Sequence, residues 1–411
     1  MKSVYINLNA KLYQNKKLIN FLKNDLLISA YNYPIDTKKR RFEIIKKKFD
    51  IFINYLVLIL ANPFPSRKNL YYLKNNKNFL KKNLNMLKIF ISKLNLLPSM
   101  SNLYYFYFYF YKKKNYYFDY ILCDFRLSTI YNNSIEVLFR SLKKKTKLIC
   151  IVNSWDNIFH SNVMKHADKY IVWSNYNKKL LNKIHNIKND KIVVIPPLSF
   201  QYLDKYKITK KKQKKILFIC AHDYKDQNTN DNFFFDEITT IEKISKKTFE
   251  LNREYKLIVR TYPNVHFSKY NKLLKLKNVR LSFTNLNEKN YEYKKFKEIS
   301  EAKFVMGFGS TMNLEAALKN KIVIHISFTY SNNEMFNEFI NHMDHLRIIS
   351  PKRFLNVVNN ELELEKCLTE ILKYKRLDVY TKYNNLIKSN FFDKTIFNKS
   401  LIKSKYLSIF K

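Results

Sequence analysis

Short apolar runs alternate with segments of helical length from about residue 116 onward. In the first half of the chain these runs predict buried strands at 120–123, 147–152, 169–173 and 192–195, with a helix at 134–142. Ser174 follows the third strand and is placed to cap a helix that runs to about residue 184. Strands that alternate with helices indicate a parallel, doubly wound sheet.

A second round of the same pattern follows a stretch rich in proline and lysine. Pro196 and Pro197 precede a charged run at 205–215, which indicates a linker between domains. Strands are then predicted at 216–220, 256–259, 277–282, 303–306 and 321–326, and helices at 237–250, 293–299 and 311–318. We therefore expect an α/β protein with Rossmann-like domains at 1–200 and 201–350 facing across a cleft. C-terminal helices at 351–411 are expected to pack back on the core.

The first 115 residues are rich in lysine and asparagine and give a weaker pattern. Residues 25–31 predict an early strand. Tyr and Phe alternate with a period of two at 105–111, which predicts a half-buried strand. Because three lysines follow at 112–114, an aromatic patch at a membrane interface is the alternative.

The net charge of +43 indicates that several kinds of anionic partner could bind the protein. Nucleic acids, anionic membranes and phosphorylated substrates would all be attracted to such a protein. Lys, Asn, Ile, Tyr and Phe are enriched while Arg, Gly, Ala and Pro are depleted, which a bias toward AT-rich codons also produces. The lysines are dispersed, whereas base-stacking modules interleave aromatic residues with Gly and Arg. We therefore expect no specific nucleic-acid partner.

Cysteine usage and the length of the apolar runs bear on the compartment. The four cysteines are far apart and include no C-x-x-C, so neither a zinc site nor a disulfide framework is indicated. Cys123, Cys150 and Cys220 lie in apolar runs and are expected to be small core residues. The longest apolar stretches, 51–61 and 103–111, fall short of the roughly 20 residues that span a bilayer, and no secretory leader is evident. We expect a cytoplasmic protein with peripheral contact to the anionic inner face of the cell membrane.

The chain contains only two glycines, Gly307 and Gly309, where average usage would give roughly 29. Both are therefore expected at backbone positions that no other residue can fill. They lie between a predicted strand and a predicted helix, where a phosphate can approach backbone N–H groups and the positive end of the helix dipole. The alternative is a tight turn with a positive φ, for which one glycine would usually suffice. We predict a phosphate site at Gly307, Gly309, Ser310 and Thr311.

Two charged residues are candidates for contacts with the rest of such a ligand. Glu315 lies one helical turn beyond Thr311. The third helical position is Asn313 or Leu314 rather than the Glu or Gln of a capping box, so capping does not explain Glu315. Its carboxylate could accept hydrogen bonds from ribose hydroxyls, and a solvated helix glutamate is the alternative. Arg260 ends a predicted strand and is placed to neutralise a diphosphate.

Polar residues also follow two other predicted strands, and doubly wound sheets bind ligands beyond the carboxyl ends of their strands. His222 follows the first strand of the second half, and a surface loop histidine is the alternative. Asp156 lies in Ser154-Trp155-Asp156-Asn157 after a strand of the first half. A carboxylate there is suited to act as the base that activates an acceptor hydroxyl. An Asx turn with a packed tryptophan is the alternative.

Residues 116–328 resemble the GT-B glycosyltransferase superfamily. They are most similar to bacterial surface- and capsular-polysaccharide proteins related to CDP-glycerol glycerophosphotransferases and UDP-N-acetylglucosamine 2-epimerases. The resemblance is carried by 154–157, 167–174, 191–196 and Gly-Phe-Gly-Ser-Thr at 307–311 with Glu-Ala-Ala at 315–317. It implies that the C-terminal half binds the nucleotide donor, with Gly309, Ser310 and Thr311 at the phosphates and Glu315 near the ribose. The N-terminal half would bind the acceptor beside Asp156.

The sequence departs from these relatives at two places. Tyr262-Pro263 stands where they often have His-Pro after the basic strand. The first 115 residues contain no glycine, so the usual Gly-rich loop after the first strand is missing. Both departures leave open an inactive relative.

The expected function is transfer of a sugar or polyol phosphate from a nucleotide-sugar or CDP-polyol donor to a glycan or lipid-linked acceptor, in capsular or lipopolysaccharide-type synthesis. Asp156 and His222 are the expected catalytic residues, and Ser154, Trp155 and Asn157 the acceptor-side ones. No metal or cofactor is expected, because a helix N-terminus and basic residues would carry the diphosphate charge and no D-x-D motif occurs. A UDP-sugar 2-epimerase-like enzyme and a non-catalytic basic nucleic-acid-binding protein are the alternatives.

Overall fold

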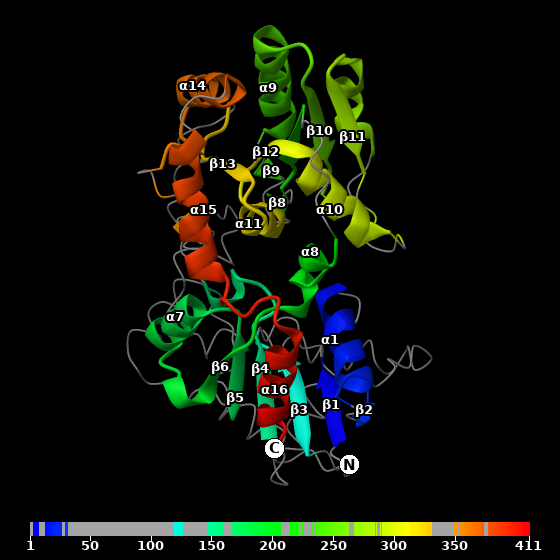
Figure 1. Cartoon of the computed structure of the whole chain (residues 1–411), viewed down its shortest axis with the longest axis vertical. Helices are drawn as coiled ribbons and strands as arrows, with labels where there is room; N and C mark the ends of the chain where they lie inside the picture. The colour runs from blue at the N-terminus through cyan, green and yellow to red at the C-terminus, as the bar shows by residue number, and fades with distance from the viewer. Residues whose placement is uncertain are drawn as a thin grey trace, which may run out of the picture. The chain divides into compact units, whose positions relative to one another are not determined.

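The structure is a computed structural model with two compact units (Figure 1). Unit 1 comprises Met1–Ser199 and Asp393–Lys411, and unit 2 comprises Phe200–Phe392. The residues that the structure describes are 3–7, 13–26, 29–31, 119–125, 147–159, 167–206, 214–221, 224–225, 232–233, 236–262, 267–283, 285, 288, 290–330, 348–349, 351, 354–373 and 377–411.

Unit 1 is built on a six-stranded parallel sheet. In sheet order its strands are β2 (Ser29–Tyr31), β1 (Ser3–Asn7), β3 (Tyr120–Asp124), β4 (Lys147–Ile151), β5 (Lys169–Val172) and β6 (Ile192–Val194). Because all the strands are parallel, the residues that follow β4, β5 and β6 gather at one edge of the sheet. This is the edge where doubly wound sheets bind their ligands.

Two helices from distant parts of the sequence cover the same face of this sheet (Figure 1). They are α1 (Tyr13–Asn24) and α16 (Lys399–Ile409). Alternate strand residues such as Tyr120 point into the layer beneath them, and the Tyr120 ring packs edge-on against Phe410 at 5.2 Å between centroids. The core of unit 1 is therefore closed by Asp393–Lys411, the segment that follows unit 2 in the sequence.

Helix α7 (Asn175–His185) packs against β5 and β6 of the same sheet. The Ser174 side chain accepts a hydrogen bond from the Asn177 backbone N–H at 3.1 Å, which confirms the predicted cap. Cys123 and Cys150 lie side by side on β3 and β4 with their Sγ atoms 3.3 Å apart. All four cysteines are buried and free, so the expected core role of Cys123, Cys150 and Cys220 is confirmed.

Unit 2 repeats the arrangement with a second six-stranded parallel sheet. In sheet order its strands are β11 (Val279–Ser282), β10 (Lys256–Arg260), β7 (Lys215–Ile219), β12 (Ala302–Gly307), β13 (Ile322–Ile326) and β14 (Val357–Val358). Its longer helices are α9 (Glu237–Leu251), α10 (Tyr291–Glu301), α11 (Thr311–Leu318), α14 (Glu361–Leu372) and α15 (Leu377–Phe391). The short helix α8 (Tyr202–Lys205) contacts α10, and the two-residue strands β8 (Tyr224–Lys225) and β9 (Asn232–Phe233) pair with each other. Arg260, Ser282 and Gly307 each end a strand and so share one edge of the sheet.

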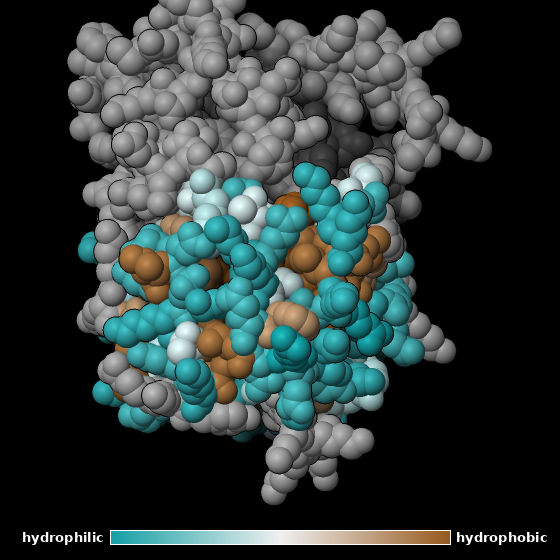
Figure 2. Space-filling view, turned by 90° about the horizontal axis from the view of Figure 1, so that it is seen from above, coloured by the Kyte–Doolittle hydropathy of each residue, from teal (hydrophilic) through white to brown (hydrophobic). Residues whose placement is uncertain are grey.

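The face of unit 2 in Figure 2 is mainly hydrophilic, with smaller hydrophobic areas between the hydrophilic ones. Ion pairs join α9 to α14: Lys243 contacts Glu361 at 3.1 Å and Lys247 contacts Glu365 at 2.9 Å. Single exposed apolar residues such as Leu362 are ordinary on protein surfaces. Within the part of the chain that the structure describes, no helix is long and apolar enough to cross a membrane.

The structure confirms the α/β class and the two parallel sheets. The strands predicted between residues 120 and 326 agree with the observed ones to within two residues at each end. The early strand expected at 25–31 is wrong in its first half, because Asp25 and Leu26 close the turn that ends α1 and only Ser29–Tyr31 is strand. The expected elements at 105–111 and 134–142 lie outside the described residues.

Candidate functional site

The two glycines lie where strand β12 turns into helix α11, at the carboxyl edge of the unit 2 sheet. Ser310 is the N-cap of α11 and has extended backbone. Asn313 Oδ1 accepts hydrogen bonds from the Ser310 backbone N–H at 3.0 Å and the Ser310 hydroxyl at 2.8 Å. Asn313, at the third helical position, thus binds the Ser310 N–H as the Glu or Gln of a capping box would. The usual capping-box motif has only Glu or Gln at this position, so the contact with Asn313 was not predicted.

Gly309 has a φ of +95°, which side chains with a Cβ rarely adopt. A Cβ on Gly309 would lie 2.5 Å from Ile349 Cδ1 and 2.8 Å from His325 Cε1. The protein's own atoms therefore require glycine at this position, as expected for a backbone position that no other residue can fill.

Gly307 has a separate structural reason. Its φ is not positive, but a Cβ would lie 2.7 Å from the Ile219 carbonyl oxygen at the end of β7 and 3.3 Å from Asn313 Oδ1. One glycine serves the turn and the other serves close packing of β12 on β7. The tight-turn alternative therefore accounts for Gly309, strand packing accounts for Gly307, and the phosphate role stays a prediction.

The loop nevertheless presents a surface suited to an anion. Gly309, Ser310 and Thr311 are half-buried, whereas Gly307 and Phe308 are buried. The N-terminal peptide groups of α11 follow directly, and the positive end of the helix dipole favours negative charge there.

His325 on β13 lies beside this loop, and the sequence analysis did not single it out. It is paired in register with Gly307, is 1% exposed, and its Nε2 has no hydrogen-bond partner among the described residues. Burial lowers the pKa of His325 to about 3, so the imidazole is neutral at neutral pH. One sequence feature could have identified His325 as a candidate. It is a titratable residue inside the apolar run at 322–326, which predicts the strand after the two glycines.

A cluster of four charged residues lies at the same edge of unit 2, and we call it the edge cluster: Arg260, Lys295, Glu298 and Glu315. Arg260, at the end of β10, pairs with Glu298 of α10, which also accepts a hydrogen bond from the Ser282 hydroxyl. The Arg260 side chain is 3% exposed, and its guanidinium carbon lies 5.4 Å from the centre of the Tyr291 ring. The cation expected to neutralise a diphosphate is thus already paired with a carboxylate.

The second pair of the edge cluster joins Lys295 to Glu315. Lys295 Nζ lies 2.7 Å from Oε1 and 2.5 Å from Oε2 of Glu315, and the Glu315 side chain is 2% exposed. The alternative of a solvated helix glutamate is therefore wrong. Burial and the Glu315 carboxylate raise the pKa of Tyr202, whose ring centre lies 5.3 Å from Lys295 Nζ. Glu315 is a buried, charge-compensated group, and its contact with a ribose stays a prediction.

Glu292, in the first turn of α10, adds a titratable carboxyl to this region. Its pKa rises to about 7 through burial, which outweighs the lowering by Lys295, and the Glu315 carboxylate raises it further. A carboxyl group with a pKa near 7 can both accept and donate a proton at neutral pH. No local sequence pattern marks Glu292, because its environment arises only when α10 packs on the sheet.

In unit 1, the segment 154–157 follows β4, as expected for an acceptor-side site. Trp155 is 4% exposed and Asn157 is 7% exposed, whereas Ser154 and Asp156 are half-buried. The Asn157 backbone N–H donates to the Ser154 carbonyl at 3.0 Å, which closes a turn. Trp155 is thus packed in the interior, as in the alternative of a turn with a packed tryptophan. Asp156 is partly exposed and could contact a ligand.

His222 lies outside the described residues. The residue before it, Ala221, donates its backbone N–H to Glu237 Oε1 at 2.5 Å, and Glu237 Oε2 accepts from the Tyr270 hydroxyl at 3.3 Å. Among the described residues, no group of three or more His, Cys, Asp or Glu side chains is arranged to hold a metal ion.

No protein-family profile and no curated protein matches the sequence. Among solved structures, S. aureus MnaA in a co-structure with UDP is similar at a TM-score of 0.53 and 10% identity, covering 100% of this chain and 98% of that one. The UDP-GlcNAc 2-epimerase from Neisseria meningitidis bound to UDP-GlcNAc has a TM-score of 0.50 and 14% identity, covering 99% and 100%. A glycosyltransferase from Rickettsia africae has a TM-score of 0.44 and 13% identity, covering 100% and 98%. The first two likenesses extend over both units, and they show that this chain has the GT-B type of fold that its sequence resembles.

Proposed function

We propose that the chain is a nucleotide-sugar-utilising enzyme whose donor binds to unit 2 at Gly309, Ser310 and Thr311. The observation that carries the proposal is this half-buried loop, which opens α11 at the carboxyl edge of a parallel sheet. The fold supports it, because two proteins of the same fold were solved with UDP or UDP-GlcNAc. A donor diphosphate here would be stabilised by peptide N–H groups and the helix dipole, without a metal or cofactor.

The edge cluster constrains how the rest of the donor binds. Two cations and two anions are paired inside it, so it offers a diphosphate no net positive charge as it stands. A ribose hydroxyl donating to Glu315 would share that carboxylate with Lys295, and Lys295 could then turn toward a phosphate oxygen. Arg260 contacts Glu298 through Nη1, and its buried Nη2 has no hydrogen-bond partner among the described residues, so Nη2 could donate to a donor oxygen while the ion pair is kept.

The proposed reaction is transfer of a sugar or polyol phosphate to a glycan or lipid-linked acceptor held by unit 1, in surface polysaccharide synthesis of the capsular or lipopolysaccharide type. Asp156 would accept the proton of the acceptor hydroxyl, with His222 as a second acid or base and Ser154, Trp155 and Asn157 shaping the acceptor side. The charge of +43 would hold the protein at the anionic inner face of a membrane in a salt-dependent manner.

Epimerisation of a UDP-sugar is the second candidate, and Glu292 favours it. Epimerisation needs more than one acid or base, and Glu292 adds a carboxyl with a pKa of about 7 to Asp156 and His222. Isotope exchange from solvent into a UDP-sugar, without an acceptor, distinguishes epimerisation from transfer.

Calorimetric titration of the full chain with UDP, CDP, GDP and inorganic diphosphate tests the donor site. Glu315→Gln should weaken the preferred nucleotide about tenfold, which corresponds to roughly 1.4 kcal/mol, and should not weaken diphosphate binding, because it leaves the positive charge of Lys295 in place. Glu250→Gln is the matched control, because Glu250 is exposed on α9 of the same unit. Wild-type protein that binds none of the nucleotides would contradict the proposal and favour the nucleic-acid alternative.

A further inference from the structure

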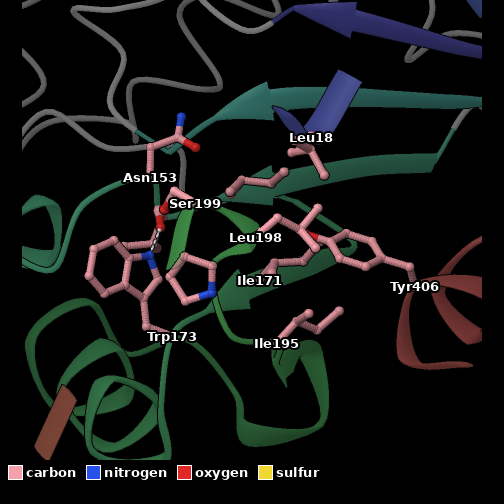
Figure 3. A pocket seen from close by; sticks show the side chains of 11 residues that line it. Leu18, Asn153, Ile171, Trp173, Ile195, Leu198, Ser199 and Tyr406 are labelled. Atoms are coloured by element: carbon pink, nitrogen blue, oxygen red, sulfur yellow. Dashed lines mark hydrogen bonds between the residues drawn. The ribbon is translucent and has the colours of Figure 1, made fainter. Parts of the chain in front are cut away.

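Unit 1 contains a pocket at the carboxyl ends of β4, β5 and β6 (Figure 3). Its volume is about 380 Å³ when the open mouth is included. Sheet residues and the loop after β6 form its floor, while Leu18 of α1 and Tyr406 of α16 form its far wall. The pocket therefore belongs wholly to unit 1 and lies beside the loop that carries Asp156.

The walls of the pocket are mostly aliphatic. Ile171, Ile195 and Leu198 face it together with Leu18. None of the lining residues that the structure describes is charged. A charged ligand group inside would lose its hydration without gaining a counter-ion, so the pocket suits a neutral group.

One end of the pocket is polar. Asn153, Ser199 and Trp173 lie at this end, opposite Leu18 and Tyr406 (Figure 3). The Trp173 indole N–H donates to the Val152 carbonyl at 2.8 Å, which fixes the ring.

The other two polar groups at this end have no partner. Asn153 Nδ2 and Ser199 Oγ are buried, and neither makes a hydrogen bond within the described residues. Buried polar groups in proteins are nearly always bonded, so this pair of orphaned donors indicates that a ligand supplies an acceptor.

We propose that this pocket binds the acetamido group of an N-acetylated sugar in the acceptor, an inference that rests on the proposed acceptor role of unit 1. The acetamido oxygen would accept hydrogen bonds from Asn153 and Ser199, and its methyl group would lie among Ile171, Ile195 and Leu198. A free amino group or a carboxylate would bind poorly, because its charge would be buried without a counter-ion. An alkyl chain would also bind poorly, because it would leave both hydrogen-bond donors without an acceptor. Asn153 lines the pocket and lies three residues before Asp156 in the segment that follows β4, so the proposed base belongs to the same loop as the polar end of the pocket.

Saturation-transfer NMR with the full chain tests the proposal, with methyl glycosides of N-acetylglucosamine, N-acetylgalactosamine, glucosamine and glucose as probes. At least one N-acetylated glycoside should bind tenfold or more tightly than the amino and hydroxyl forms. Ser199→Ala and Asn153→Ala should each weaken that binding about tenfold. Ser404→Ala is the matched control, because Ser404 is exposed on α16, and it should bind as wild type does.

Thermal unfolding of the same variants separates binding from folding. Removing an orphaned hydroxyl deletes no hydrogen bond, so Ser199→Ala should keep or raise the wild-type Tm while it weakens sugar binding. A lower Tm would assign Ser199 a structural role and overturn the inference. Equal binding of all four glycosides, or of none, overturns it as well.

UDP titration keeps this outcome distinct from that of the donor proposal. UDP binding without acetamido selectivity leaves the donor site standing and removes the pocket assignment. Acetamido selectivity without nucleotide binding would support the pocket assignment and remove the donor site. Unit 1 would then be a sugar-binding module.

Discussion

The carboxyl edges of the two sheets differ in how their polar groups are satisfied. In unit 2 the edge cluster pairs two cations with two carboxylates inside the protein. In unit 1 the corresponding edge holds an apolar pocket in which Asn153 and Ser199 have no partner among the described residues. A ligand at the edge cluster must therefore share or replace existing ion pairs, whereas a ligand in the unit 1 pocket meets no ion pair. Unpartnered polar atoms occur at both edges, because Arg260 Nη2 and His325 Nε2 of unit 2 also have no hydrogen-bond partner among the described residues. We infer that unit 2 can hold its site together without ligand, and that unit 1 gains more order from binding.

The largest effect should come from breaking a buried pair of the edge cluster. Lys295→Met would leave the Glu315 carboxylate buried without its counter-ion and should lower the free energy of unfolding by about 3–5 kcal/mol. Urea denaturation measures this effect. The double variant Lys295→Met/Glu315→Leu should recover much of the loss, since it removes both charges; if it is no more stable than the single variant, the buried pair is not the cause.

A smaller loss should follow Gly309→Ala. The positive φ should cost about 1–3 kcal/mol, and the clash of the new Cβ with Ile349 and His325 adds to it. Ile349→Val removes the nearest clashing atom, so Gly309→Ala/Ile349→Val should lose less than the sum of the single variants in the same denaturation assay. Strict additivity would show that the clash with Ile349 Cδ1 contributes nothing to the loss.

The free energy of unfolding of unit 2 should depend on pH because of the buried His325. Its pKa is about 3 in the folded protein and near 6.5 when unfolded, so between these values the unfolded chain binds the additional proton. Stability should therefore fall as the pH drops from 6.5 toward 3, by at most about 1.4 kcal/mol per pH unit from this group. His325→Gln should reduce that slope in urea denaturation at a series of pH values. An unchanged slope would mean that the buried carboxylates alone set the acid sensitivity.

The smallest effect should come from an ion pair at the surface. Lys243 and Glu361 are 3.1 Å apart, but their side chains are 49% and 41% exposed. Lys243→Ala should change the free energy of unfolding by about 0–1 kcal/mol, and less in high salt. A loss comparable to that of Lys295→Met would remove the contrast between buried and exposed pairs.

Much of the fold was predictable because continuous apolar runs mark the strands of a parallel sheet wherever they occur. Helix α1 was missed, although its buried residues Leu18, Ile19 and Leu22 have helical spacing, because the surrounding sequence is rich in lysine and asparagine. The loop at 307–311 was recognised because it contains both glycines of the chain.

The surroundings of the candidate site could not be predicted. Glu315 takes its counter-ion from α10, and Gly309 is crowded by Ile349, which lies 40 residues later in the sequence. Such neighbours are set by how helices pack on the sheet, and one sequence carries no local signal of them. The sequence was therefore sufficient to identify the candidate site residues, but it was not sufficient to predict the residues that contact them.

Helix α16 has a consequence for the order of events during translation. Unit 2 is one uninterrupted stretch, Phe200–Phe392, but the core of unit 1 and the far wall of its pocket need Tyr406 and Phe410. These residues leave the ribosome only after unit 2 has been made, so unit 2 can mature first although it is the later domain in sequence. Until then, nascent unit 1 exposes the hydrophobic layer that α16 covers, which is the kind of surface that chaperones bind.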